Sequence, residues 1–443
     1  MSLTRWRRVS LNLEAELAAR ISGVTRYYDQ LIQWLPQPWD TGALLERSDC
    51  PERRMLETGS EFPDLSTERD QRTAVLLNGT LNYHFDVQRL LQELHPKLSR
   101  TSRVIAICYN PYLRWVYRIA AYLNLLNAEV PDTFLTRQSL ANLARISHFE
   151  IVRTRPAGFI PLRLFGIVTV INRLLGVLPV IRNLSFASVV FLRPIKPSED
   201  KPSLSIIIPA RDEAGNIEAA LERLPDFDGA EVEVIFVEGH SSDDTWATIE
   251  RVVDEWSPRI PCRAFRQTGK GKADAVRLGF SHARCDLLTI LDADLTMPPE
   301  LLTRYYEAYT EGHADFINGS RLIYPMESEA MRFLNQLGNV VFAKMLSVLV
   351  EAPLSDVLCG TKLFARRDYD RFIHWRDDFG DFDPFGDFEL IFPAAVMALG
   401  IIDIPVRYLD RTYGATSIRR FAHGFELLKM TAVGLVRIKL GSG

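Results

Sequence analysis

Short apolar runs alternate with amphipathic stretches from residue 203 onward. The pattern predicts strands at 203–210, 232–239, 262–265 and 286–294, with one helix ending near Leu224 and another across 245–256. Apolar strands that alternate with helices predict a parallel sheet covered on both faces. Ligands of such sheets bind beyond the carboxyl ends of the strands, so those ends are where chemistry is expected.

The first half of the chain has a similar pattern. Strands are predicted at 73–77, 103–108 and 187–192, and helices at 87–94 and 140–146. The segment 195–203 is short, polar, charged and proline-bearing, which is typical of a linker. The sequence therefore predicts two α/β domains, 1–195 and 203–443.

Charge distinguishes the two halves. Residues 1–200 hold 25 Lys and Arg against 19 Asp and Glu, whereas residues 201–443 hold 27 against 37. The segment 151–196 has seven basic residues and no acidic one, but its longest uninterrupted apolar piece, 164–171, is far shorter than the roughly 20 residues of a membrane-spanning helix. Two interpretations stay open: a segment lying on an anionic membrane surface, or a buried helix with solvated arginine tips.

The five cysteines are scattered and odd in number, and none forms a CxxC pair. This predicts neither a disulfide framework nor a zinc site, and it favours a reducing cytoplasmic setting. The N-terminus has no apolar region followed by a small-residue cleavage site, so no signal peptide is expected. We expect a peripheral protein at the cytoplasmic membrane face.

Asp292 and Asp294 follow a buried strand, one residue apart. At the end of a sheet both carboxylates can turn toward one divalent cation, and Mg²⁺ typically takes one or two carboxylates plus substrate phosphates. The alternative is an acidic turn that caps the strand. Pro298 and Pro299 are suited to begin the following helix, where a missing N–H is tolerated.

The other strand ends also carry polar residues. Pro209, Arg211 and Glu213 are suited to frame a base, and Glu238 to hydrogen bond a ribose or base edge, although Glu213 or Asp243 taken singly also suits a helix N-terminus.

Lys270 and Lys272 sit in a glycine-bearing turn before a helix, a setting for anion binding without the Walker spacing. A solvated basic turn is the alternative.

Seven motifs together carry a resemblance: SIIIPARDE, FVEGHSSDDT, GKGKADAVRLGF, LDADLTMPPEL, GSRLIYP, DVLCGTKLF and PVRYLDRTYGATSI. In this order they resemble the family-2 glycosyltransferases of the GT-A fold, specifically the dolichyl- or polyprenyl-phosphate sugar synthases, over residues 203–430. Thr296 stands where mannosyl members usually carry Gln, and Arg211 where they carry Tyr.

The resemblance implies roles for individual residues. The nucleoside would be held by Pro209, Arg211, Glu213 and Glu238. Mg²⁺ or Mn²⁺ would lie among Asp292, Asp294 and Thr296. Phosphates would be bound by Lys270, Lys272, Arg321, Lys362 and Arg411.

Asp387 and Glu389 are candidates for a general base if the acceptor is an alcohol. A lipid phosphate is already ionised, so with that acceptor Asp387 would position rather than deprotonate. Both residues also suit the N-terminal turn of a helix.

The first half resembles the later part of a class I S-adenosylmethionine-dependent methyltransferase over residues 73–194. In that fold a strand, a helix and another strand are followed by a helix that ends in a turn, which here is His148-Phe149-Glu150. The expected glycine-rich turn near 41–60 has no GxGxG, since Gly42 and Gly59 are isolated. We therefore expect a degenerate, catalytically silent domain that docks the protein on a membrane, shapes a lipid entrance or binds a partner.

The function expected from these resemblances is inverting, metal-dependent transfer of a sugar from a nucleotide sugar to a polyprenyl or dolichyl phosphate. Mannose from GDP-mannose is the first choice, ahead of glucose or N-acetylglucosamine from UDP donors. The alternatives are transfer to a glycan or protein hydroxyl, a non-catalytic membrane adaptor, and a methyltransferase. No nucleic-acid partner is expected.

Overall fold

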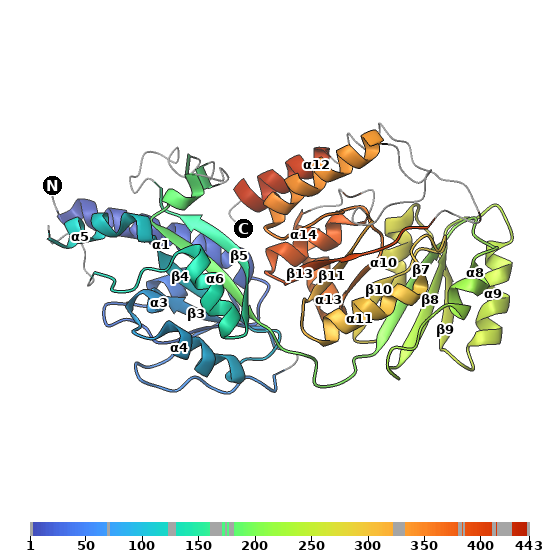
Figure 1. Cartoon of the computed structure of the whole chain (residues 1–443), viewed down its shortest axis with the longest axis horizontal. Coiled ribbons are helices and arrows are strands. Elements are labelled where there is room, and N and C mark those ends of the chain that lie inside the picture. Colours follow the sequence, from blue (N-terminus) through green and yellow to red (C-terminus); the bar gives the residue numbers. More distant parts are fainter. Residues whose placement is uncertain are drawn as a thin grey trace. The chain divides into compact units, whose positions relative to one another are not determined.

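The computed structural model of the chain describes residues 3–68, 71–122, 130–159, 171–172, 175–176, 181–321, 333–379, 383, 386–409, 413 and 428–440. The chain divides into two compact units (Figure 1). The first comprises Met1–Lys196, Val396–Ala398 and Leu435–Gly443, and the second comprises Pro197–Ala395 and Leu399–Gly434. Each unit has its own sheet, so the predicted α/β class with mostly parallel strands is confirmed.

The first unit is built on a six-stranded sheet in the order β2-β1-β3-β4-β6-β5. Its first four strands are parallel, and β6 runs antiparallel to both β4 and β5. The strands are β1 (Gln30–Gln33), β2 (Glu52–Met55), β3 (Thr73–Asn78), β4 (Arg103–Tyr109), β5 (Phe149–Ala157) and β6 (Ala187–Pro194). The strands expected at 73–77, 103–108 and 187–192 are present, and three more lie beside them.

Alternation along the central strands builds two apolar layers in this unit. On β3, Val75 and Leu77 face one core and Ala74 and Leu76 face the other, because successive side chains of a strand point to opposite faces. The first layer includes α4 (Val87–Leu94) and α6 (Arg137–Ile146), and the second includes α1 (Leu3–Thr25) and α2 (Ala43–Arg47). Further helices of this unit include α3 (Thr80–Tyr83) and α5 (Arg114–Tyr122).

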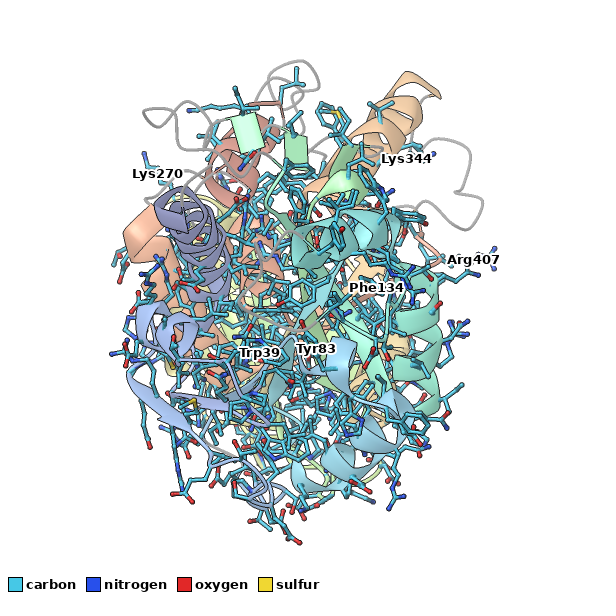
Figure 2. All side chains as sticks on the ribbon, turned by 90° about the vertical axis from the view of Figure 1, so that its left-hand side faces the viewer. Trp39, Tyr83, Phe134, Lys270, Lys344 and Arg407 are labelled. Carbon is cyan, nitrogen blue, oxygen red and sulfur yellow. The ribbon has the colours of Figure 1, made fainter. Side chains whose placement is uncertain are left out.

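Aromatic side chains gather beyond the carboxyl ends of β1 and β3. Trp39 and Tyr83 lie next to each other with ring centroids 4.8 Å apart (Figure 2), and Tyr83 meets Tyr109 at 6.3 Å. Asp40 accepts hydrogen bonds from Gln33, Asn78 and the Gly42 N–H. The polar groups at this edge are therefore largely bonded to one another.

The second unit is built on a seven-stranded sheet in the order β13-β11-β12-β10-β7-β8-β9. The strands are β7 (Leu204–Ala210), β8 (Val232–Glu238), β9 (Cys262–Arg266), β10 (Leu287–Ile290), β11 (Phe316–Ser320), β12 (Lys362–Ala365) and β13 (Ile401–Pro405). All four predicted strands are present, but β10 ends at Ile290, before the two aspartates. Only β12 runs antiparallel to its neighbours β10 and β11.

Helices cover both faces of this sheet. The helices of this unit include α8 (Ile217–Glu222), α9 (Thr245–Trp256), α10 (Lys272–His282), α11 (Leu302–Thr310), α12 (Phe333–Val350), α13 (Arg366–Phe379) and α14 (Phe388–Val396). Ile206 and Ile208 of β7 point into the core that contains α8, α9 and α11. Ile207 points to the opposite face, where α10 approaches so closely that a Cβ added at Gly279 would lie 2.5 Å from Ile207 Cγ2.

The basic segment is only partly described, since residues 160–170, 173–174 and 177–180 lie outside the described residues. Its beginning is strand β5, in which Arg153 and Arg155 are buried. Within the first unit these guanidinium groups donate to the carbonyls of Val396 (2.7 Å) and Ile438 (2.8 Å). The guanidinium groups of Arg153 and Arg155 are therefore hydrogen-bonded inside the fold, whereas much of the apolar run that the two interpretations concern lies outside the described residues.

All five cysteines are buried and free. Burial raises the pKa of the Cys108 and Cys359 thiols to about 12. Within the part of the chain that the structure describes, no helix is both long and apolar enough to cross a bilayer.

Candidate active site

Three loops meet at the carboxyl edge of the second sheet. Strands β10, β7 and β8 are parallel neighbours, so their carboxyl ends lie side by side, as predicted. Each of the following loops contains one non-glycine residue with left-handed backbone: Asp212 (φ 54°), His240 (φ 59°) and Leu295 (φ 53°). Such conformations are costly and gather at functional sites.

The loops after β7 and β8 are joined by hydrogen bonds. Asp212 accepts from the Ser242 N–H (2.7 Å), and the Glu213 N–H donates to Thr245 Oγ1 (2.9 Å). Glu213 and Glu238 are both buried, and they accept from Asn216 Nδ2 and the Ser241 N–H respectively. These two acids therefore also serve to hold their own loops.

The other expected nucleoside residues differ in exposure. Pro209 is the penultimate residue of β7, and Arg211 just beyond it is exposed, 3.7 Å from the Asp212 carboxylate. Lys270 is exposed on the loop before α10. Arg211 and Lys270 can therefore reach a ligand at this edge of the sheet, but no buried partner among the described residues holds either side chain in place.

Gln267 is a residue that sequence reasoning missed. It follows β9, is 5% exposed, and donates from Nε2 to the Gly269 carbonyl (3.2 Å). Its Oε1 is buried and accepts no hydrogen bond in the structure. A buried acceptor without a donor is costly, so it marks a place where a ligand N–H or O–H would be favoured.

Asp292 forms an ion pair with Lys272, the first residue of α10. Asp294 is buried and accepts from Thr296 Oγ1 (2.7 Å) and the Thr296 N–H (3.1 Å). Gly360 lies against the ion pair, since a Cβ added there would be 2.1 Å from Lys272 Nζ and 2.6 Å from Asp292 Oδ2. The structure therefore brings together four predicted residues, Asp292, Lys272, Asp294 and Thr296, and one glycine that was not singled out.

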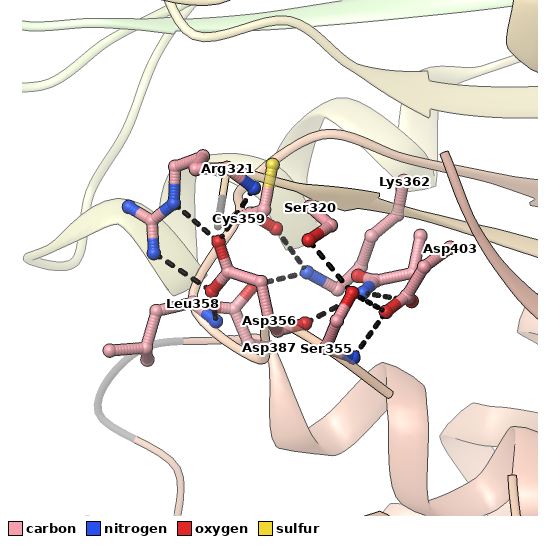
Figure 3. A network of polar contacts seen from close by, with 10 residues as sticks. Ser320, Arg321, Ser355, Asp356, Leu358, Cys359, Lys362, Asp387 and Asp403 are labelled. Carbon is pink, nitrogen blue, oxygen red and sulfur yellow. Dashed lines mark hydrogen bonds and ion pairs between the residues drawn. The ribbon is translucent and has the colours of Figure 1, made fainter. Parts of the chain in front are cut away.

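Arg321, at the end of β11, pairs with the buried Asp356 through two hydrogen bonds, Nε to Oδ2 (2.6 Å) and Nη2 to Oδ1 (2.9 Å) (Figure 3). Asp356 also accepts from the backbone N–H groups of Arg321 (3.1 Å) and Leu358 (3.0 Å). The hydroxyl of Ser355, the residue before Asp356, forms hydrogen bonds with Ser320 and Asp403. The guanidinium is thereby held by a carboxylate that is itself fixed from several sides.

Lys362 begins β12 and is fully buried, donating to Asp387 and to the Cys359 carbonyl (2.6 Å) (Figure 3). Because β12 is antiparallel, its first residue reaches the edge where its neighbours end. Glu389 instead forms a bidentate pair with Arg277 of α10, and Asp383 accepts from the Phe388 and Glu389 N–H groups at the start of α14. Asp387 therefore faces the site with Lys362, whereas Glu389 joins α14 to α10 through Arg277.

Three cations and four carboxylates now share this edge: Lys272, Arg321 and Lys362 with Asp292, Asp294, Asp356 and Asp387. Burial opposes ionisation of Asp292, but the Lys272 ammonium holds the pKa of that carboxyl below its ordinary value. Burial likewise disfavours charged Lys272, yet the carboxylates of Asp292 and Asp387 raise its pKa. Arg321 lowers the pKa of Asp356 against the effect of burial. The pairs are therefore ionised together.

Tyr408 approaches the same edge and was not singled out from the sequence. Arg321 lies over its ring at 5.5 Å, and the next residue, Leu409, donates its N–H to the Thr296 carbonyl (2.8 Å). Burial raises the pKa of Tyr408. Arg411, expected at this end of the motif, lies outside the described residues.

The residues present fit a divalent cation. Within the described ranges no three His, Cys, Asp or Glu side chains lie together so that they could hold a metal ion by themselves. However, Mg²⁺ bound with a nucleotide needs only one or two carboxylates because phosphates and water complete its coordination. Asp292 and Asp294 are hard oxygen donors on one turn, with a lysine and the Thr296 hydroxyl beside them.

Comparison with known proteins matches residues 205–372 to the family described as Glycosyl transferase family 2. A dolichol-phosphate mannosyltransferase of Pyrococcus furiosus is 33% identical over 136 residues, which are 30% of this chain and 37% of that protein. A dolichyl-phosphate hexose transferase of Haloferax volcanii is 28% identical over 48% of this chain and 85% of its own length. The chain thus spans little more than a third of the first relative and most of the second.

Among solved structures, a mannosyltransferase from Pyrobaculum calidifontis in complex with GDP-Man and Mn²⁺ is 18% identical. The match covers 55% of this chain and 66% of that one, with a TM-score of 0.37.

Proposed function

We propose that this chain, whose residues 205–372 match the family described as Glycosyl transferase family 2, transfers a hexose from a nucleotide sugar to a polyprenyl or dolichyl phosphate with inversion. GDP-mannose is the preferred donor. The relatives support this, since one is named a dolichol-phosphate mannosyltransferase and another a dolichyl-phosphate hexose transferase.

The donor would lie across the strand ends. Glu213, Glu238 and Gln267 are the buried polar side chains nearest to where β7, β8 and β9 end, which suits recognition of the nucleoside. Asp292 and Asp294 would hold Mg²⁺ or Mn²⁺, which supplies Lewis-acid stabilisation of the leaving diphosphate. Lys272 places a charge directly beside these carboxylates, so it would neutralise the same diphosphate.

The observation that carries the choice of acceptor is the ion pair between Asp387 and Lys362. The Asp387 Oδ1 atom already accepts from a fully buried ammonium. A carboxylate bound in this way serves to place a cation, whereas an alcohol acceptor needs a carboxylate that faces its hydroxyl proton. A phosphate acceptor is already ionised, and Lys362 with Arg321 would supply the charge that binds it.

A lipid-linked acceptor requires contact with a membrane surface. In the second unit, α12 exposes Val340, Val341, Met345 and Val348 on one side, together with Lys344. Residues 428–434 are helical and pack against α12 at Gly434, where an added Cβ would lie 2.5 Å from Leu349 Cδ2. Among them, Leu428 and Lys429 are exposed. Apolar residues with lysines suit peripheral binding to anionic lipid.

For the first unit we propose a catalytically silent, methyltransferase-like domain. The mostly parallel sheet supports this, as do the isolated glycines Gly42 and Gly59 in place of a glycine-rich turn. The carboxyl edge is occupied by the bonded groups of Asp40, Gln33 and Asn78. Calorimetry that detects S-adenosylmethionine binding would contradict this proposal.

The test is incubation of the whole chain with Mg²⁺ or Mn²⁺, polyprenyl phosphate and labelled GDP- and UDP-sugars, followed by extraction into organic solvent. We expect lipid-linked label from one donor, lost with EDTA and reduced at least about a hundredfold in Asp294→Asn. Asp254→Asn, on the exposed side of α9, is the matched control and should transfer normally.

Full activity of Asp294→Asn, or undiminished activity in excess EDTA, would refute the metal-dependent mechanism. The second candidate is transfer to a hydroxyl. It would be favoured if an alcohol acceptor were glycosylated, polyprenyl phosphate were not, and Asp387→Asn lost several orders of magnitude in rate.

A further inference from the structure

Helix α5 of the first unit and the turn before it carry an exposed aromatic face. Tyr112, Trp115, Ile119 and Tyr122 have relative exposures of 65%, 62%, 51% and 87%. They are spaced three, four and three residues apart, which places them on one side of a helix. Large apolar side chains scattered singly on a surface are ordinary, but a continuous stripe indicates a binding surface.

The opposite side of this helix is firmly attached to the unit. The Tyr117 ring lies 5.7 Å from that of Tyr109 and 5.9 Å from that of Phe134, and its hydroxyl donates to the Phe186 carbonyl. Ala120 is buried on the same side. The first unit therefore packs against the Tyr117 side of α5, and its fold does not require aromatic side chains on the opposite side of the helix.

The start of the exposed face is also fixed. Asn110 accepts from the Tyr112 N–H (2.9 Å) through Oδ1, and its Nδ2 donates to the carbonyls of Asn183 (2.7 Å) and Ser185 (2.6 Å). The aromatic stripe is thus presented on a preformed support, which lowers the entropic cost of binding.

The face is positively charged. Arg114 and Arg118 are exposed, and residues 110–122 contain no Asp or Glu. The Arg114 guanidinium lies 5.5 Å from the centroid of the Phe134 ring, which is labelled in Figure 2. Tyr and Trp with an apolar body and a polar tip, flanked by arginines, match the boundary between acyl chains and anionic headgroups.

We propose that this face, Tyr112, Trp115, Ile119 and Tyr122 with Arg114 and Arg118, docks the first unit on an anionic lipid bilayer. This proposal rests on the proposed function. An enzyme whose acceptor is linked to a lipid must reach that acceptor at a membrane, and docking would bring it there. The proposal assigns membrane contact to α5, outside the basic segment 151–196 and outside the transferase unit.

The test is flotation of the whole chain with vesicles of phosphatidylcholine alone and of phosphatidylcholine with about one third phosphatidylglycerol. We expect preferential binding to the anionic vesicles, weakened by high salt. Replacing both arginines, Arg114→Gln with Arg118→Gln, should weaken partitioning about 30-fold, since each contributes roughly a factor of five. Trp115→Ala should weaken it about tenfold.

Phe85→Ala is the matched control, because Phe85 is a fully exposed aromatic residue of the same unit outside the stripe. It should bind vesicles as the unaltered chain does. Trp115 also provides a direct readout, since lipids with brominated acyl chains should quench tryptophan fluorescence in the unaltered chain and much less in Trp115→Ala.

Equal binding of all variants, or no binding to anionic vesicles, would overturn the proposal. So would a dimer that is lost in Trp115→Ala without vesicle binding, because the face would then serve a second copy of the chain. Flotation needs no turnover, so the proposed transfer reaction can fail while docking holds. Conversely, a variant that does not float could still transfer sugar normally to an acceptor dispersed in detergent. That result would show that docking is not essential for transfer, but it would not refute docking itself.

Discussion

Gly360→Ala should separate activity from stability. A Cβ at this position would lie 2.1 Å from Lys272 Nζ and 2.6 Å and 3.0 Å from the Asp292 carboxylate oxygens. Ordinary contacts require about 3.5 Å, so the ammonium must move by more than about 1 Å. Both partners are ends of side chains at the open edge of the sheet, so they can move without disturbing the core.

The two expected effects differ greatly in size. Displacing a preorganised charge from the leaving group costs about a hundredfold to a thousandfold in kcat, or roughly 3–4 kcal/mol. The unfolding free energy should change by no more than about 1 kcal/mol, because an ion pair that is still partly exposed contributes little and alanine restricts the unfolded chain.

Gly279→Ala is the contrasting variant. Its Cβ would lie 2.5 Å from Cγ2 and 3.0 Å from Cγ1 of the fully buried Ile207, a β-branched side chain that has little freedom to move. Overpacking of this kind should cost about 1–3 kcal/mol. Initial rates of transfer and urea denaturation followed by circular dichroism measure both effects. Nearly normal rates for Gly360→Ala, or a loss of stability equal to that of Gly279→Ala, would refute the reasoning.

Two further predictions concern buried polar groups. The pKa of Asp356 is lower in the folded chain than its ordinary value of 3.8, so the Arg321 pair stabilises the fold above about pH 4 and this contribution is lost as pH falls through the folded pKa. Asp356→Asn should therefore lower the free energy of unfolding by about 3 kcal/mol at pH 7, and by progressively less below pH 4, as measured by urea denaturation. A loss that does not change with pH would contradict this. Gln267→Leu removes a buried acceptor that has no donor together with the Nε2 hydrogen bond to the Gly269 carbonyl, so the unfolding free energy should change by no more than about 1 kcal/mol, while KM for the nucleotide sugar should rise about tenfold. An unchanged KM would show that Oε1 does not contact the donor.

The central parallel strands of each sheet, β3 and β4 in the first and β10, β7 and β8 in the second, were predictable from sequence because they are continuous apolar runs. The strands from Leu204 to Ala210 and from Thr73 to Asn78 are buried almost throughout, so periodicity alone identifies them. Asp292, Asp294 and Lys272 were foreseen for a related reason. They follow such strands directly or begin the next helix, and parallel neighbours end at one edge.

The rest of the site depends on partners far apart in the chain. Lys362 reaches the edge because β12 runs antiparallel, and nothing in KLFA indicates strand direction. Asp356 and Gly360 matter because of Arg321 and Lys272, 35 and 88 residues earlier. β2 was missed because all four of its residues are exposed, which leaves no apolar alternation to detect. The periodicity of apolar residues indicates which side chains are buried. These features depend instead on which strands and side chains pair across long stretches of the chain.

The burial of every cysteine has a practical consequence for probing this protein. Native thiols with raised pKa values react slowly with maleimides, so the folded chain is in effect a cysteine-free background for labelling. A single cysteine introduced on an exposed position would be modified selectively, without first removing five native residues. A spin label or fluorophore could then report the depth of one chosen helix in a vesicle, and slow labelling of the native thiols would follow unfolding in the same sample.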